Sequence, residues 1–176
     1  MTTFFASRPV FPTVVTGLLL ALGTPAFSAT LPVLPDFTAA VFHPGAPIDN
    51  RYFPLSPGAR SALEARGKDA DGERFFERGE LEYGGAGPFL AGVQTTALID
   101  RAYESGVLVE ETLDYYAQDA AGNVWYMGED VTNYVYDDDG NLIGTNTDSS
   151  WRAGVNGAQP GYAMPADPMV GFAYYQ

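Results

Sequence analysis

The sequence predicts an all-β, or nearly all-β, fold built on an antiparallel β-meander that curves into a half-barrel or a sandwich. One turn pattern, Asp-x-x-Gly-Asn, occurs twice, at 119–123 and 137–141, and alternating apolar and polar residues flank both copies. A type I turn followed by a left-handed glycine closes a three-residue hairpin loop of this kind. A third hairpin fits a two-residue loop at Ser105-Gly106. Residues 94–151 therefore predict five or six consecutive antiparallel strands.

Residues 1–29 have the pattern of a signal peptide. Arg8 supplies the positive charge, residues 14–22 form a short apolar run, and small residues precede a cleavage point after Ser28 or Ala29. No later segment has the roughly 20 apolar residues of a membrane-spanning helix, so we expect no membrane span in the mature chain. The prediction is an exported protein, periplasmic or extracellular.

The mature chain divides into an extended, proline-rich lead-in at 30–48 and a single β-rich domain at 49–176. Residues 60–66 are compatible with a strand or a helix. The highly charged segment 73–83 predicts an edge strand, because charge protects exposed edges. Residues 84–92 form a glycine-rich loop that lacks the lysine and hydroxyl residue of a phosphate-binding loop.

The central hairpin at 114–130 has a register fixed by its turn. The pattern places Tyr116 opposite Tyr126 and Tyr115 opposite Met127, since antiparallel partners step outward together. One face is apolar and is predicted to lie in the core; it carries Leu113, Tyr115, Ala117, Trp125 and Met127. The same reasoning places Val135 opposite Ile143 in the next hairpin, and Arg101 opposite Glu110 in the preceding one.

Tyr116 and Tyr126 stand side by side on the other face of this hairpin, in a row with Tyr134 or Tyr136 of the next hairpin. Exposed tyrosines in a row can stack on a sugar or contact a partner protein. If a second layer covers that face, the same residues belong to a core instead. Both alternatives are compatible with the sequence.

Composition excludes several classes of function. The chain has a formal charge of −13 and no cysteine, and its one histidine, His43, lies in the proline-rich lead-in. Such a surface repels nucleic acids and anionic membranes. Without cysteine there are no disulfides, thiolate metal sites or cysteine nucleophiles. A single histidine in a proline-rich segment does not favour a catalytic triad, because the triad needs partners held in place on a rigid scaffold. No organic or metal cofactor is predicted beyond weak calcium.

Three motifs together resemble a family of uncharacterised secreted bacterial proteins. They are Tyr52-Phe53-Pro54-Leu55-x-Pro57-Gly58, the stretch from Tyr116 to Asp130 (YAQDxxGNVWYxGED), and Met164-Pro165-Ala166-Asp167-Pro168. The resemblance covers most of the mature chain, and the family carries no assigned activity. It also implies that related chains continue with further strand-like sequence, so that this chain is shortened at its C-terminus.

Acidic residues are the one source of catalytic chemistry in the sequence. Paired carboxylates can act as acid and base or nucleophile on glycosidic bonds. The candidates are Glu110, Glu111, Asp114, Glu129 and Asp130. Alternation places Glu111 on the apolar face, where burial would raise its proton affinity. The alternative is that Arg101 or another arginine reaches it.

Asp137, Asp138 and Asp139 precede Gly140 in a calcium-loop-like run, which fails the spacing of an EF-hand. Weak calcium binding at this turn, helped by Asp148, is one interpretation, and a solvated acidic turn is the other.

Taken together, these patterns favour an exported, non-catalytic binding or envelope protein whose partner is a small molecule, a glycan or a protein. A carboxylate-based hydrolase acting on an extracellular polymer and a calcium-stabilised surface structural domain are the alternatives.

Overall fold

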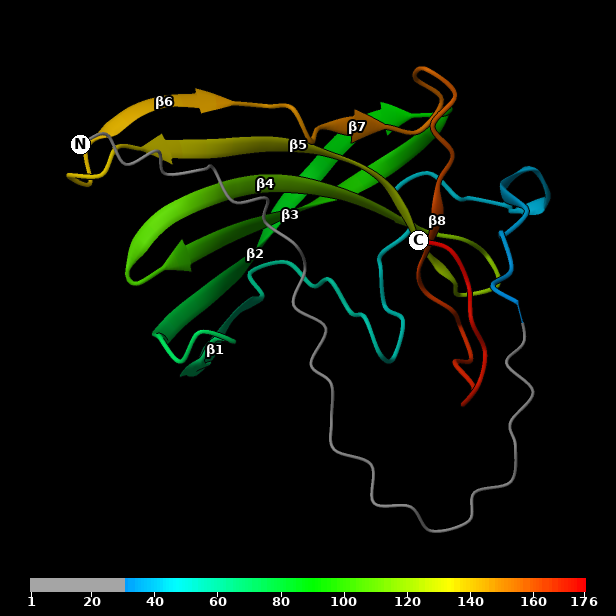
Figure 1. The fold of residues 1–176 in the computed structure, drawn as a ribbon. Helices are drawn as coiled ribbons and strands as arrows, with labels where there is room; N and C mark the ends of the chain where they lie inside the picture. The colour runs from blue at the N-terminus through cyan, green and yellow to red at the C-terminus, as the bar shows by residue number, and fades with distance from the viewer. Residues whose placement is uncertain (1–30) are drawn as a thin grey trace, which may run out of the picture.

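The computed structural model describes residues 31–176, which form one antiparallel β-sheet curled into a half-barrel (Figure 1). The predicted signal peptide lies outside these residues. The elements are a short 3-10 turn η1 (Phe37–Ala39) and the strands β1 (Arg60–Lys68), β2 (Arg74–Leu90), β3 (Val93–Glu104), β4 (Val107–Gln118), β5 (Val124–Tyr136), β6 (Leu142–Asn146), β7 (Trp151–Arg152) and β8 (Gly161–Met164). Within this range, no helix is long and apolar enough to span a membrane.

Strand β5 is the central element of the sheet. One of its edges pairs with β4, and the other pairs in succession with β8, β7 and β6, while β1 to β4 continue the meander on the β4 side. The nearly all-β meander predicted from the turn patterns is thus confirmed. Between 94 and 151 the chain forms four full strands and the start of β7.

Two local predictions were wrong. The segment 73–83 is not an edge strand, because it lies inside β2 and pairs with both β1 and β3. The edge is β1, whose nine residues are all exposed. The predicted loop at 84–92 is largely strand, since β2 continues to Leu90 through two register shifts between 83 and 89. The glycines that suggested a loop allow this irregular pairing instead.

Each predicted hairpin register holds near its turn and shifts by one residue farther out. Tyr116 pairs with Tyr126 as predicted, whereas Tyr115 pairs with Gly128 rather than with Met127. In the other two hairpins, Arg101 pairs with Glu111 instead of Glu110, and Val135 pairs with Gly144 instead of Ile143. A β-bulge in each hairpin causes the shift, and a turn pattern alone cannot predict it.

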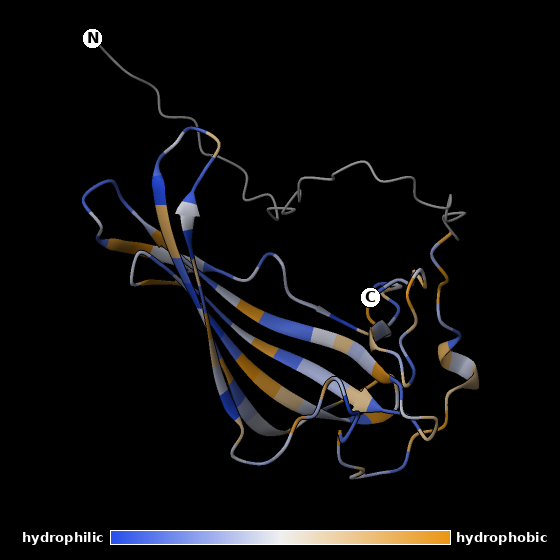
Figure 2. Ribbon diagram, turned by 90° about the horizontal axis from the view of Figure 1, so that it is seen from below, coloured by the Kyte–Doolittle hydropathy of each residue, from blue (hydrophilic) through white to orange (hydrophobic). Residues whose placement is uncertain are grey.

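The core lies at the end of the sheet that carries the 119–123 turn, and it occupies both faces. On one face, Tyr115, Ala117, Trp125 and Met127 are buried as predicted, under Phe37 and Phe42 of the lead-in. Leu113 is 38% exposed, because this cover ends before it. On the other face, Tyr116, Val124 and Leu98 are buried under Ile48, Phe53 and Leu55. Hydrophobic and hydrophilic bands alternate along the strands (Figure 2).

The buried side chain of Asn50 joins three parts of the chain that are distant in sequence. Its Nδ2 donates to the carbonyl oxygens of Gly122 (2.9 Å) and Pro165 (3.2 Å), and its Oδ1 accepts from the backbone nitrogens of Tyr52 and Phe53. The three motifs that carry the family resemblance therefore meet at one place. Their polar residues hold the loops against the central hairpin.

Candidate functional site

The two faces of the half-barrel differ sharply in charge. We call one the ion-paired face, because it carries every ion pair found among residues 31–176. These pairs join Arg60, Arg66, Arg78, Arg101 and Arg152 to Glu64, Glu80, Glu82, Glu111 and Asp130. We call the opposite one the acidic face. The strand register places Asp100, Glu110, Asp114 and Glu129 on it, and no lysine or arginine of β1–β5.

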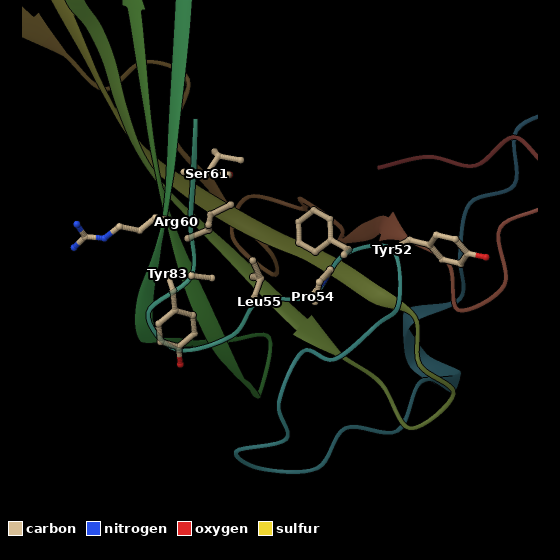
Figure 3. A pocket seen from close by; sticks show the side chains of 10 residues that line it. Tyr52, Pro54, Leu55, Arg60, Ser61 and Tyr83 are labelled. Carbon is tan, nitrogen blue, oxygen red and sulfur yellow. The ribbon is translucent and has the colours of Figure 1, made fainter. Parts of the chain in front are cut away.

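A pocket of about 370 Å³ opens on the acidic face, between the loop at 52–55 and strands β1 to β3. Its walls are mainly apolar and include Phe53, Leu55, Leu81, Tyr83 and Leu98. Figure 3 shows that the Arg60 guanidinium and the Tyr52 hydroxyl point away from the centre of the pocket. The pocket therefore presents an apolar surface to any group that enters it.

Carboxylates continue the floor of this pocket. Asp100 pairs across the sheet with Leu81 and follows Leu98 on the same face of β3, while Asp114 pairs with Leu98 itself. Directly opposed residues have Cβ atoms about 5 Å apart, so both carboxylates adjoin the apolar wall. Burial, and then the charge of Glu110, raise the pKa of Asp100. The Asp100 side chain forms no hydrogen bond or ion pair with any of residues 31–176.

Asp114 and Glu129 share one phenol. The hydroxyl of Tyr126 lies 2.6 Å from Asp114 Oδ1 and 2.8 Å from Glu129 Oε2. A phenol has a single hydrogen to donate, so both contacts are hydrogen bonds only when one of the two carboxyl groups carries a proton. Asp114 is a more favourable site for this proton than Glu129, because Asp114 is only 7% exposed. Burial, together with the charges of Asp100, Glu129 and Glu110, raises the pKa of Asp114 to about 6, although the Tyr126 hydrogen bond acts in the opposite direction.

The tyrosine row is covered rather than open. Tyr116 is buried, 4.9 Å from the ring of Phe53 and stacked on Tyr126 at 5.1 Å. Tyr126 also packs edge-on against Trp151. Tyr134 pairs with Thr145 and lies on the ion-paired face, so the three tyrosines do not form one surface. Tyr126 contributes its hydroxyl to the site, and the ring of Tyr116 stacks against the Tyr126 ring.

Glu111 lies on the ion-paired face, where Arg101 Nε donates to its Oε2 at 2.7 Å. The alternative interpretation, that an arginine reaches Glu111, therefore describes this residue. Asp114 is the buried one among the five acidic candidates that the sequence offered. The signal that could have singled it out is its place beside Tyr116, once both faces of the hairpin are known to be covered.

The acidic run at 137–139 closes its own turn. Asp137 accepts hydrogen bonds from the backbone nitrogens of Asp139 and Asn141 and from the Asn141 side chain. These bonds, those of Asn141 first, lower the pKa of Asp137. Asp148 lies beyond the far end of β6. Nowhere in 31–176 do three or more histidine or acidic side chains come together as metal ligands.

The calcium prediction has a direct test. Because Asp137 is occupied by its turn and Asp148 is distant from it, we expect the melting temperature to be the same in millimolar calcium and in excess chelator. A calorimetric scan under both conditions measures this. If calcium raised the melting temperature by several degrees and Asp138→Asn removed this increase, the result would support a structural calcium site at this turn.

Comparison with known proteins adds no identity to these observations. No protein-family model matches the chain, and neither a curated protein nor a solved structure matches it. The family resemblance of the three motifs thus stays a prediction, and the functional argument depends on the geometry of the acidic face.

Proposed function

We propose that the protein is an exported, non-catalytic binding protein for a small amphipathic cation. The observation that supports this most directly is the position of an apolar pocket beside carboxylates that have no arginine or lysine partner on their face. The apolar body of the ligand occupies the pocket beneath the 52–55 loop. Its cationic or hydrogen-bond-donating group faces Asp100, with Asp114 behind it.

Charge complementarity favours a cation over other ligands. Burial first, and then the charges of neighbouring carboxylates, raise the pKa values of Asp100 and Asp114, so these carboxyl groups lack solvation and also repel one another. A bound ammonium group relieves this repulsion, whereas an anion increases it. The apolar wall adds about 25 cal/mol for each Å² of ligand surface that leaves water. Together these terms select an alkyl or aryl ammonium compound.

The test uses three probes of equal chain length: octyltrimethylammonium, octyl glucoside and octyl sulfate. In calorimetric titrations below the micelle concentrations, we expect the cation to bind about tenfold or more tightly than the neutral probe, a difference of about 1.4 kcal/mol. The sulfate should bind most weakly. Equal affinity for all three probes, or no binding of any, would reject the proposal.

Two variants and one control locate the site. Asp100→Asn should abolish the preference for the cation while the neutral probe binds as before, and Leu81→Ser should weaken both. Asp167→Asn removes one exposed acid outside the site and should change neither affinity. If Asp167→Asn lowered the affinity for the cationic probe as much as Asp100→Asn does, the effect would come from the net charge of the protein rather than from a binding site.

A carboxylate-based hydrolase is the second candidate. It is supported by the shared phenol, which holds Asp114 and Glu129 close together, and by the raised pKa of Asp114. A protonated carboxyl beside an ionised one is the pair that glycoside hydrolysis requires. Turnover of an extracellular polysaccharide that disappears in both Asp114→Asn and Glu129→Gln, but persists in Glu111→Gln, would favour this candidate over the binding protein.

A further inference from the structure

Strand β1 is one edge of the sheet and pairs only with β2 among the described strands (Figure 1). Its nine residues run without a register shift, and all of them are exposed. The strand contains neither a proline nor a bulge, two features that protect exposed edges from pairing. A long and regular edge of this kind accepts a further strand.

The backbone hydrogen bonds of β1 determine which residues can pair at its outer side. Just before the strand, Ala59 accepts through its carbonyl oxygen from the backbone nitrogen of Tyr83, and just after it the Asp69 nitrogen donates to the Glu73 carbonyl oxygen. In an antiparallel pair, such hydrogen-bonded positions alternate with positions whose N–H and C=O groups point the other way. The even-numbered residues 60–68 therefore direct these groups outward, away from β2.

The charges of β1 select one antiparallel register with a second copy of the same strand. Outward residues must face outward residues, so the pairing is centred on a single residue. Registers centred on residue 63, 64 or 66 place like charges directly opposite each other, which is unfavourable. Centred on Ala65, the register instead places Glu64 opposite Arg66 of the other copy, and does so twice. A register centred on Ala62 also pairs opposite charges but overlaps only residues 60–64 of the strand.

The same register covers apolar surface on the acidic face. Leu63 is 63% exposed, and it would lie opposite Gly67 of the other copy. The ring of Phe75 lies over Gly67, where a Cβ atom would be 2.8 Å from the ring. Residues in a pair without hydrogen bonds have Cα atoms only about 4.5 Å apart. Leu63 of one copy can therefore reach across the glycine to the Phe75 ring of the other, at two symmetric places.

We propose that two copies of this chain pair through their β1 strands in this register, so that the two half-barrels share one continuous sheet. The overlap runs from Ala62 to Lys68 and adds about eight backbone hydrogen bonds. It leaves Arg60 and Ser61, which line the pocket beneath the 52–55 loop, outside the paired residues. The dimer is thus independent of the ligand proposed for that pocket.

The acidic character of the protein does not oppose this contact. The chain carries a formal charge of −13, but the β1–β2 hairpin from residue 60 to 74 is neutral. Its four basic and four acidic residues are Arg60, Arg66, Lys68 and Arg74 and Glu64, Asp69, Asp71 and Glu73. At an ionic strength of 0.15 M, exposed charges more than about 8 Å away are largely screened. Two neutral hairpins can therefore approach each other, although the whole chains repel at low salt.

Sedimentation equilibrium in 0.15 M NaCl tests the dimer, with the natural chain expected to show a reversible monomer–dimer equilibrium in the micromolar range. Glu64→Arg and Arg66→Glu each place like charges opposite one another at two symmetric positions. Each variant alone should therefore self-associate about tenfold more weakly or less. An equimolar mixture of the two variants should associate as tightly as the natural chain, because every arginine then faces a glutamate. A loss of folding in either variant could not produce this recovery.

Asp138→Arg is the matched control, because it makes the same change of charge as Glu64→Arg on an exposed turn outside β1. It should dimerise as the natural chain does. A natural chain that stays monomeric up to about 1 mM, or a mixture of the two variants that fails to associate, would reject the dimer. Assemblies that keep growing with concentration would also reject it, since they would indicate pairing of β1 with β6, the opposite edge of the sheet.

Discussion

Replacing Asp119 with alanine is expected to lower the free energy of unfolding by about 3 to 4 kcal/mol. Its Oδ1 accepts from the backbone nitrogens of Ala121 and Asn123, and its Oδ2 accepts from Asn123 Nδ2 and Trp125 Nε1. Trp125 is 1% exposed, so without Asp119 its indole N–H is buried with no partner. Such a group costs about 1 to 3 kcal/mol beyond the lost turn bonds. Urea denaturation followed by tryptophan fluorescence measures the change.

The chain contains its own control for this prediction. Asp137 closes the second Asp-x-x-Gly-Asn turn with the same backbone and asparagine hydrogen bonds, but it is exposed and has no tryptophan partner. We expect Asp137→Ala to shift the urea midpoint by only a small fraction of the Asp119→Ala shift. Equal shifts would mean that the turn itself, and not the buried indole contact, accounts for the effect.

The stability of Asp114→Asn should depend on pH differently from that of the natural chain. The pKa of Asp114 rises on folding from its ordinary value of 3.8 to about 6. Between pH 4 and 6 the folded protein therefore keeps a proton that the unfolded chain has released. By linkage, the free energy of unfolding of the natural chain falls as pH rises through this window. One pKa unit corresponds to about 1.4 kcal/mol, so we expect a loss of about 2 to 3 kcal/mol, which Asp114→Asn avoids.

The measurement is the difference in unfolding free energy between variant and natural chain at pH 4, 5, 6 and 7. This difference should move by about 2 to 3 kcal/mol in favour of Asp114→Asn as pH rises. Asp167→Asn removes one exposed carboxylate elsewhere and is the control: a change of the same size in that variant would reflect net charge rather than Asp114. Parallel curves for Asp114→Asn and the natural chain would show that Asp114 is ionised throughout, and would remove the shared proton from the site.

The charge separation between the two faces has a simple origin in the sheet. Strand residues alternate between faces, so a single register places Glu82, Arg101 and Glu111 together on one side. The same register places Asp100 and Asp114 together on the other. Because one face carries the arginines of the ion pairs, the acidic residues of the other face have no cation to offset them. The geometry that stabilises the ion-paired face thus produces the candidate site on the acidic face.

Much of the fold could be read from local sequence, because turn chemistry acts over a few residues. The pattern Asp-x-x-Gly-Asn specified both hairpin turns, with Gly122 and Gly140 at positive φ as a left-handed position requires. It also gave the pairing of Tyr116 with Tyr126 and the burial of Trp125. These features depend on contacts within one hairpin, so the sequence of that hairpin was enough to predict them.

The candidate site depended on contacts between distant segments. Gly128, at φ 144°, carries the bulge that shifts the register, and a Cβ atom there would lie 2.6 Å from the Trp151 carbonyl oxygen. That approach of β7 is not visible in the hairpin sequence. Likewise, only the packing of the 48–55 segment over the acidic face buries Tyr116 and forms the pocket. The sequence by itself therefore determined the strands and turns, through local backbone preferences. The tertiary structure decided which carboxyl groups are buried, because burial depends on the segments that the rest of the chain places over each face of the sheet.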